Sequence, residues 1–537
     1  MNKGIFAGRA IALVSMLFSV GAHAADIKIG LAAEPTAMDP HFHNLTPNNQ
    51  VVMHIFEPLI IANSKFEWQP GLAESFKAIN PTTWEFKLRR NVKFHDGSAF
   101  DANDVLFTMC RVPTVPNSPS PFTLYTKAIK EMEAPDPYTL IIKTAEPYPL
   151  LPNELSSVGI ISDSLIEGEK VKFSSAGCKI SHAMPTTADF NSGKAAIGTG
   201  PFKFKSFTKG DRIEFVRNDA YWGKKPAWDQ VIMRPIAAPG SRVAALLSGD
   251  VDFIERLPTQ DSERVKADKN YRIADVVAAR SIFLVMDQFR DPPPGVTGTS
   301  NKNPFRDVKV RRAISMAIDR TAIVKRVMGG AAEPANQLLD KSFSGADPKL
   351  PQLQYKPDEA KKLLAEAGYP NGFSVTLASP NDRYVNDAQV AQVVAQYLSR
   401  IGIKVIVNTM TSSSFFANRA KYDFGFYLAG WGAQTGEMSS PLRALVATQN
   451  KDKGWGVSNF GKYSDPELDK LIDEAMVTVD NAKRAELLAQ ASKRSMDAMA
   501  AVPLHSEKAV WAMKKSLSYE ARADEFTSAT NISPSGK

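Results

Sequence analysis

The chain has 537 residues, 44% of them hydrophobic and 23% charged, which is an ordinary composition for a globular protein. The formal net charge of +8 is small for this length and no basic block stands out, which argues against a nucleic-acid-binding protein. Beyond residue 24 no apolar run approaches the roughly eighteen residues of a membrane-spanning helix, so we expect a soluble protein.

Residues 1–24 have the pattern of a secretory signal peptide. Lys3 and Arg9 make a basic start, residues 10–20 are apolar, and residues 22–24 form an A-x-A cleavage site. The apolar stretch is too short to span a bilayer. The pattern predicts export and removal of the signal, with a retained anchor as the alternative.

The N-terminal part is expected to consist mainly of strands and turns. Polar and apolar residues alternate over 83–94, which predicts a half-buried hairpin, and again over 199–217, which predicts a second one. Asp101 is expected to cap a helix over 101–109, with an acidic residue three positions later. The Pro- and Ser-rich segment 111–121 predicts a loop.

The C-terminal half is expected to contain more helices. Asp307 is placed to cap a helix that runs to residue 318, and further helices are predicted over 358–367 and 388–399. Ser464 and Glu467 have the spacing of a capping box ahead of another helix. Because strands alternate with these helices, the fold class is α/β.

Two small groups of residues could carry chemistry. Cys110 and Cys178 are the only cysteines, and an oxidising compartment would permit a disulfide that stabilises by about 4 kcal/mol, although two separate buried thiols are equally compatible. His41, His43 and His54 lie close in sequence and could hold a metal, but no cysteine or carboxylate cluster joins them. The alternative is polar residues near a cleft, and we expect no cofactor.

The sequence contains no nucleophile, metalloprotease, P-loop or dinucleotide-binding motif, so an enzyme is disfavoured. The segment 422–437 is a better candidate site, because aromatic residues lead into a Trp between two glycines and then into a polar loop. Glycines let a ligand approach the backbone, and Trp supplies a flat apolar wall. The alternative is a buried strand that ends in an ordinary turn.

Segments along nearly the whole chain resemble the family 5 extracytoplasmic solute-binding proteins of ABC importers, whose relatives bind dipeptides, oligopeptides, glutathione or nickel. They are EPTAMDPH (34–41), TWEFKLRRNVKFHDGSAFDANDVLFT (83–108), GTGPFKFKSFTKGDRIEFVRNDAYWGKKP (198–226), VAALLSGDVDF (243–253), PFRDVKVRRAISMAIDR (304–320) and EAGYPNGF (366–373).

The resemblance implies a two-lobed periplasmic-binding-protein fold with a hinge and an extra inserted α+β domain. The expected divisions are 1–24 for the signal peptide, 25–58 and 196–278 for lobe I, 59–195 for the inserted domain, 279–500 for lobe II and 501–537 for the C-terminal return to lobe I.

The resemblance also implies that a peptide lies extended between the lobes and pairs with the protein backbone. The two edges of this slot would be formed by Glu34, Pro35 and Thr36 and by Gly430, Trp431 and Gly432.

Charged ends of the ligand would be read by residues at family positions. Arg383 and Tyr384 match the place where dipeptide-binding relatives hold the ligand carboxylate, and a guanidinium fork suits a carboxylate. Alternatively, Arg383 is only a surface residue. Relatives commonly carry an aspartate for the α-amine where this chain has Gln434, and Glu437 is expected to replace it. The segment around Gln434 is more similar to the glutathione-binding branch than to the dipeptide branch.

The resemblance therefore implies a monomeric binding protein in the periplasm that captures peptides or peptide-like ligands and delivers them to the permease and ATPase subunits of an ABC importer. The alternatives are the same role for glutathione, an opine-like conjugate, haem or nickel, or a sensory protein that docks on a chemoreceptor.

Overall fold

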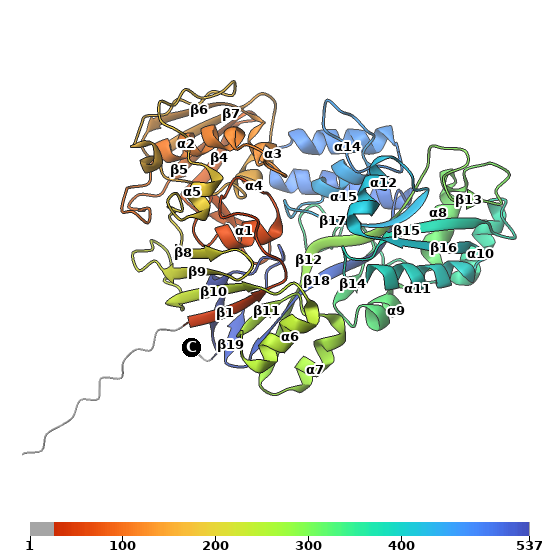
Figure 1. Cartoon of the computed structure of the whole chain (residues 1–537). Coiled ribbons are helices and arrows are strands. Elements are labelled where there is room, and N and C mark those ends of the chain that lie inside the picture. The colour runs from red at the N-terminus through yellow and green to blue at the C-terminus, as the bar shows by residue number, and fades with distance from the viewer. Residues whose placement is uncertain (1–25, 536–537) are drawn as a thin grey trace, which may run out of the picture.

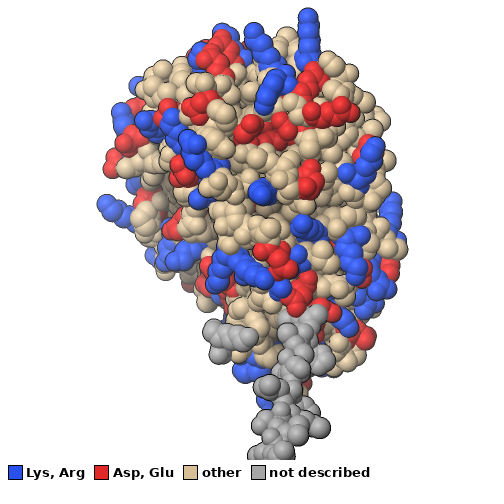
Figure 2. Space-filling model, turned by 90° about the vertical axis from the view of Figure 1, so that its left-hand side faces the viewer, with Lys and Arg blue, Asp and Glu red and all other residues tan. Residues whose placement is uncertain are grey.

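The structure, a computed structural model, describes residues 26–535 and shows two lobes with an additional domain on the first (Figure 1). The signal peptide predicted at residues 1–24 lies outside the described residues. Within the described range, no helix is both long and apolar enough to cross a membrane. On the face shown in Figure 2, Lys and Arg side chains are interspersed with Asp and Glu, in line with the small net charge.

A twelve-stranded sheet runs through both lobes and connects them. Its central strands, β12 (Tyr271–Met286) and β18 (Val502–Lys514), pair antiparallel along most of their length, with a register shift between Val277 and Ser281. β18 lies beside a lobe II strand over 505–507 and beside a lobe I strand over 511–513. These two long strands therefore form the connection between the lobes.

Lobe I is built on the five strands at one end of this sheet. They are β1 (Asp26–Leu31), β8 (Phe202–Thr208), β9 (Arg212–Arg217), β10 (Gln230–Pro235) and β11 (Phe253–Glu255). β8 and β9 form the hairpin predicted over 199–217, and β1 pairs in parallel with β10 and β11. The helices of this lobe are α1 (Thr46–Val52), α6 (Pro239–Ser248) and α7 (Ser262–Ala267).

The inserted domain contains a short two-stranded pair and a separate four-stranded antiparallel sheet in the order β4-β5-β7-β6. The strands are β2 (Ile60–Ala62), β3 (Trp68–Pro70), β4 (Ala73–Asn80), β5 (Thr83–Leu88), β6 (Ile129–Asp136) and β7 (Thr139–Thr144). β5 pairs with β4 and β7 and not with residues 92–94, so the hairpin predicted over 83–94 has the right strand but the wrong partner.

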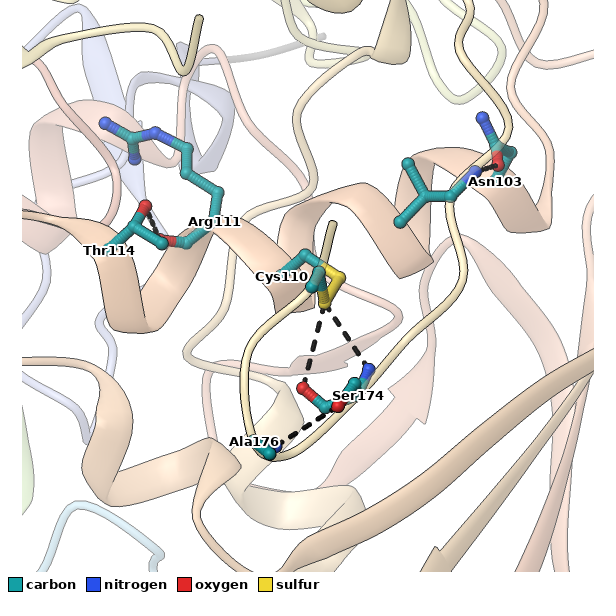
Figure 3. Close-up of a disulfide and its surroundings, with 8 residues drawn as sticks. Asn103, Cys110, Arg111, Thr114, Ser174 and Ala176 are labelled. Carbon is teal, nitrogen blue, oxygen red and sulfur yellow. Dashed lines mark hydrogen bonds between the residues drawn. A yellow bond between two sulfur atoms is a disulfide. The ribbon is translucent and has the colours of Figure 1, made fainter. Parts of the chain in front are cut away.

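The helices of the inserted domain are α2 (Ala102–Arg111), α3 (Thr123–Thr126), α4 (Leu151–Leu155) and α5 (Thr187–Asn191). The capping box at Asp101 is present as predicted. A 3-10 turn continues α2 to Thr114, inside the predicted loop, because a proline is tolerated at the start of a helical turn. Cys110 of α2 and Cys178 form a disulfide that ties the loop around Ser174 to the helix (Figure 3).

Lobe II contains the remaining strands of the large sheet and most of the helices. The strands are β13 (Val296–Thr297), β14 (Ala332–Pro334), β15 (Ser374–Pro380), β16 (Lys404–Met410) and β17 (Phe426–Gly432). The helices are α8 (Val308–Met316), α9 (Arg320–Ala322), α10 (Pro357–Glu366), α11 (Asp387–Ser399), α12 (Ser412–Ala420), α13 (Ser439–Pro441), α14 (Pro466–Val477) and α15 (Asn481–Asp497).

The predicted helix boundaries in lobe II agree closely with the structure, with one correction. Asp307 caps α8 as expected. The cap of α14 is Asp465 and not Ser464, because the Asp465 carboxylate accepts the backbone N–H groups of Glu467 and Leu468. After β18 the chain ends on lobe I with β19 (Leu517–Tyr519) and β20 (Ile532–Pro534).

Candidate functional site

A cavity of about 450 Å³ lies where lobe I, lobe II and the connecting strands meet. Lobe I supplies residues 255–260, lobe II supplies residues 382–386, and β18 supplies residues 507–511. The lobe II segment follows the carboxyl end of β15, which pairs in parallel with β16. Ligands of open α/β sheets bind at that end of parallel strands, so this cavity is the candidate ligand site.

The two lobes touch at the edge of this cavity. The Asn386 side chain of lobe II donates to Thr259 Oγ1 of lobe I at 3.0 Å and to the Val327 carbonyl at 2.8 Å. The inserted domain also reaches lobe II, where the rings of Phe66 and Phe343 meet edge to face with centroids 6.3 Å apart. The cavity is therefore bordered by one contact between the lobes, and a second contact joins the inserted domain to lobe II away from it.

Three cavity residues other than glycine hold the left-handed backbone conformation. They are Arg256 (φ 48°), Asn386 (φ 54°) and Glu525 (φ 67°). Such residues are uncommon, and they persist only where the surrounding structure fixes them. Their gathering around one cavity marks it as a place where side-chain position matters more than local backbone preference.

Arg383 and Tyr384, predicted as carboxylate-binding residues, both line this cavity. Asp387 holds their loop, because its carboxylate accepts the backbone N–H groups of both residues at 3.0 Å. The Arg383 guanidinium lies over the Tyr384 ring, 5.4 Å from its centroid. Among residues 26–535 no carboxylate forms an ion pair with Arg383, so its charge is available to a ligand.

Partial burial lowers the pKa of Arg383, and the positive charge of nearby Arg280 lowers it further. Both effects favour binding of an anion, since an anion would relieve the repulsion and replace lost hydration. The Arg383 side chain nevertheless keeps contact with solvent inside the cleft, so a ligand can reach it.

The cavity also contains an ion network that sequence analysis missed. Arg280 donates to Glu525 at 2.7 Å and lies 3.7 Å from Glu507, whose other oxygen accepts the Val385 N–H at 3.0 Å. Burial favours the protonated form of Glu525, but the charge of Arg280 outweighs it and lowers the pKa. These residues belong to no motif and come together only through the discontinuous topology, so no local sequence signal could have identified them.

The glycines beside Trp431 make room for protein side chains. A Cβ atom on Gly430 would lie 2.7 Å from the Tyr384 ring, and one on Gly432 would lie 3.2 Å from the Arg280 guanidinium. The Tyr384 hydroxyl donates to the Gly430 carbonyl at 3.2 Å. The stretch 430–432 thus supports two cavity residues from behind, and does not itself line the cavity.

The other predicted edge also lies outside the cavity lining. The Glu34 carboxylate accepts the Gly210 N–H at 2.5 Å, Pro35 is buried, and Thr36 bonds to Asn48 and His43. From this strand end, only Ala32 is among the lining residues.

Glu437 was expected to meet a ligand amine, but the structure shows that its carboxylate already has partners within the protein. Its carboxylate accepts Arg484 Nε at 2.9 Å and the Ser439 hydroxyl at 2.5 Å, and its side chain is only 3% exposed. Gln434 lines a second cavity, of about 650 Å³, between lobe I, the inserted domain and the C-terminal segment. The structure therefore separates Gln434 from Arg383, although both were assigned to one site.

The three candidate histidines have separate contacts, and His43 Nδ1 lies 3.0 Å from the Thr36 hydroxyl. His41 donates to the Gly159 carbonyl and accepts from Arg111, whereas His54 donates to the Val51 carbonyl and accepts from the Ala529 N–H. Within residues 26–535 no group of three or more His, Cys, Asp or Glu side chains could hold a metal ion.

Comparisons with known proteins identify the family of this chain. Residues 67–453 match the family model "Bacterial extracellular solute-binding proteins, family 5 Middle". The chain is 29% identical to the glutathione-binding protein of Shigella dysenteriae serotype 1 over 522 residues, which cover 95% of this chain and 94% of that protein.

Two solved structures share the fold over almost the whole chain. HbpA2 from Haemophilus parasuis is 22% identical, with a TM-score of 0.79 over 95% of this chain and 99% of that one. The Escherichia coli murein tripeptide binding protein MppA is 22% identical, with a TM-score of 0.70 over 96% and 99%. Since the family model covers well over half of the residues, the chain belongs to family 5 of the bacterial extracellular solute-binding proteins, the solute-capturing components of ABC importers.

Proposed function

We propose that the protein captures a short peptide-like ligand between its lobes and delivers it to the membrane permease of an ABC importer. Glutathione is the first candidate, because relatives 28–29% identical that match 95% of the chain are named glutathione-binding proteins. The observation that carries the proposal is the guanidinium of Arg383, which lines the cavity between the lobes and has no carboxylate partner among residues 26–535.

The charges of the cavity suit a ligand of this class. A carboxylate would meet Arg383 in bidentate geometry, with the Tyr384 ring beside it. We infer that the protein binds as a monomer, because one chain supplies every side of the cavity.

Calorimetry with purified mature protein tests the proposal. Glutathione should bind with a single site per chain, and unrelated sugars should not bind. A lack of binding by glutathione and by a panel of dipeptides and tripeptides would contradict a peptide-like ligand. Turnover of a bound peptide, abolished by substitution of a residue of this chain, would contradict a role in binding alone.

Export to the periplasm is the second part of the proposal. It rests on the signal-peptide pattern of residues 1–24 and on the family. N-terminal sequencing of the protein from a periplasmic extract should give a chain that starts at Ala25 or close to it. Recovery of the uncleaved chain in the membrane fraction would instead indicate a retained anchor.

A further inference from the structure

The cavity between the lobes carries an unbalanced positive charge. Five lining side chains are cationic and four are anionic, so one positive charge is in excess; they are Arg242, Arg256, Arg280, Arg383 and Lys508, and Glu255, Asp382, Glu507 and Glu525. Four of these side chains are held in place by partners of their own: Arg242 by four backbone carbonyls, Lys508 by Glu333, Asp382 by the Ser412 N–H, and Glu255 by Gln50, Thr527 and Ala32.

Both carboxylates are oriented toward the same arginine. Arg280 lies 2.7 Å from Glu525 and 3.7 Å from Glu507. Arg256 reaches only the outer edge of this network, 3.9 Å from Glu525, and its side chain is 55% exposed. The unneutralised charge is therefore shared by Arg256 of lobe I and Arg383 of lobe II, which line the cavity from the two lobes.

The position of Arg256 is fixed by its backbone. Its φ of 48° is left-handed, and its carbonyl accepts Arg242 Nη2 at 3.0 Å. Arg242 is itself buried and also bonds to the carbonyls of Ile236, Ala237 and Glu255. Such bonds hold a strained loop in place, so Arg256 is presented to the cavity by a rigid support.

We propose that Arg256 and Arg383 clamp one anionic group of the ligand, of the carboxylate class, between the two lobes. Arg256 is then a specificity-determining residue for binding. Two guanidinium groups that approach each other repel, and an anion between them turns that repulsion into attraction. The anion would stabilise the closed arrangement by its differential affinity for it, so a ligand without the anionic group would close the lobes poorly.

The first experiment needs no ligand. Dyes attached to the outer surfaces of lobe I and lobe II would report the distance between the lobes by energy transfer at low ionic strength. Arg256→Glu should shift the distances toward shorter values, because an acid would then face Arg383. The double variant Arg256→Glu/Arg383→Glu should lose this shift, since like charges face each other again. Arg264→Glu, an equal charge change on the exposed surface of α7, is the control.

The outcomes decide the clamp independently of the ligand's identity. A shift for Arg256→Glu that the double variant and high salt reverse supports the proposal. Equal distances for Arg256→Glu and Arg264→Glu would overturn it.

The second experiment uses glutathione and derivatives in which each carboxylate in turn is converted to an amide, and this choice of probe alone rests on the proposed function. Arg256→Gln should weaken glutathione binding by about 10- to 100-fold, as for a lost hydrogen bond to a charged group. One amide should bind weakly to the parent protein and lose nothing further in Arg256→Gln. Unchanged affinities for all probes in Arg256→Gln would overturn the clamp. Failure of the parent protein to bind any probe would refute glutathione as ligand, and the distance measurement would still judge the clamp.

Discussion

Two arginines of lobe II differ in what surrounds them. Arg484 lies in the interior of the lobe, 5% exposed, with its Nε bonded to Glu437. Arg383 lies in the cavity between the lobes, and no carboxylate of the described chain pairs with it. A buried charge without a partner is costly, so the interior arginine has an acid of its own, whereas the cavity arginine keeps its charge free in a place that a ligand can enter.

The difference separates these two arginines by their partners. Glu437 has the residue type expected for a ligand-binding acid, but its carboxylate is already satisfied within the lobe. Arg280 is an intermediate case, because it is paired with Glu525 and still faces the cavity. Substitutions on the two sides of this comparison should therefore act on different properties, stability for the interior pair and affinity for the cavity residue.

The largest effect is expected from Glu437→Gln. The substitution leaves Arg484 buried without an anion, and breaking a buried pair in this way costs about 3–5 kcal/mol of unfolding free energy. Urea unfolding measures this loss, and calorimetry below the unfolding transition should give an unchanged affinity for glutathione. Asp473→Asn, which removes an exposed partner of Lys453 on the same lobe, is the control and should cost less than about 1 kcal/mol. Equal stabilities for the two variants would remove the basis of the comparison.

Arg383→Ala should have the opposite profile. Binding should weaken by about 2–5 kcal/mol if the ligand carboxylate is buried against the guanidinium, while the unfolding free energy should change by no more than about 0.5 kcal/mol. Arg383→Lys should recover only part of the affinity, because a point charge lacks the bidentate geometry. Arg326→Ala, an exposed lobe II arginine outside both cavities, should bind like the parent. Parent-like binding by Arg383→Ala would place the carboxylate elsewhere.

The sequence predicted features whose cause is local. The capping box at Asp101, the helices of lobe II and the hairpin at 199–217 depend on neighbouring residues, and the structure has them close to the expected positions. The resemblance also singled out Arg383 and Tyr384, and both line the cavity between the lobes. Glu437 could not be judged in this way, because its partner Arg484 is 47 residues away and no pattern links them.

Contacts between residues far apart in the sequence also explain why glycine stands at position 430. The sequence shows that Gly430 leaves space beside the strand, but not that the Tyr384 ring occupies that space. The partners of strand β5 are hidden for the same reason, since alternation predicts a strand and its buried face without naming its neighbours.

Lobe I contains a buried residue, His54, whose charge depends on pH. Burial lowers the pKa of His54 to about 4, from 6.5 in an unfolded chain. The unfolded chain therefore binds more protons between these values, so the stability that neutral His54 contributes is complete above pH 6.5 and is lost as the pH falls toward 4. His54→Gln removes this titration. The difference in unfolding free energy between parent and variant should shrink by about 2 kcal/mol from pH 6.5 to 5, at about 1.36 kcal/mol per pH unit. A difference that stays constant would show that His54 is not held neutral.

The smallest effect should come from the contact between the lobes. Thr259 Oγ1 accepts a hydrogen bond from Asn386 at 3.0 Å across the edge of the cavity. Thr259→Val keeps the shape of the side chain but removes the acceptor, while Asn386 retains its bond to the Val327 carbonyl. If the ligand binds best when the lobes touch, the loss of one such bond should weaken binding by about 1 kcal/mol, or roughly fivefold, and leave the unfolding free energy nearly unchanged. Calorimetry with glutathione measures the effect, and Thr321→Val, at an exposed lobe II position that does not line the cavity, is the control. A different result would be parent-like affinity for Thr259→Val together with a large loss of affinity for Arg383→Ala. It would mean that lobe II holds the ligand without help from the Thr259–Asn386 contact. The affinity would then depend on the charge of Arg383 and not on the contact between the lobes.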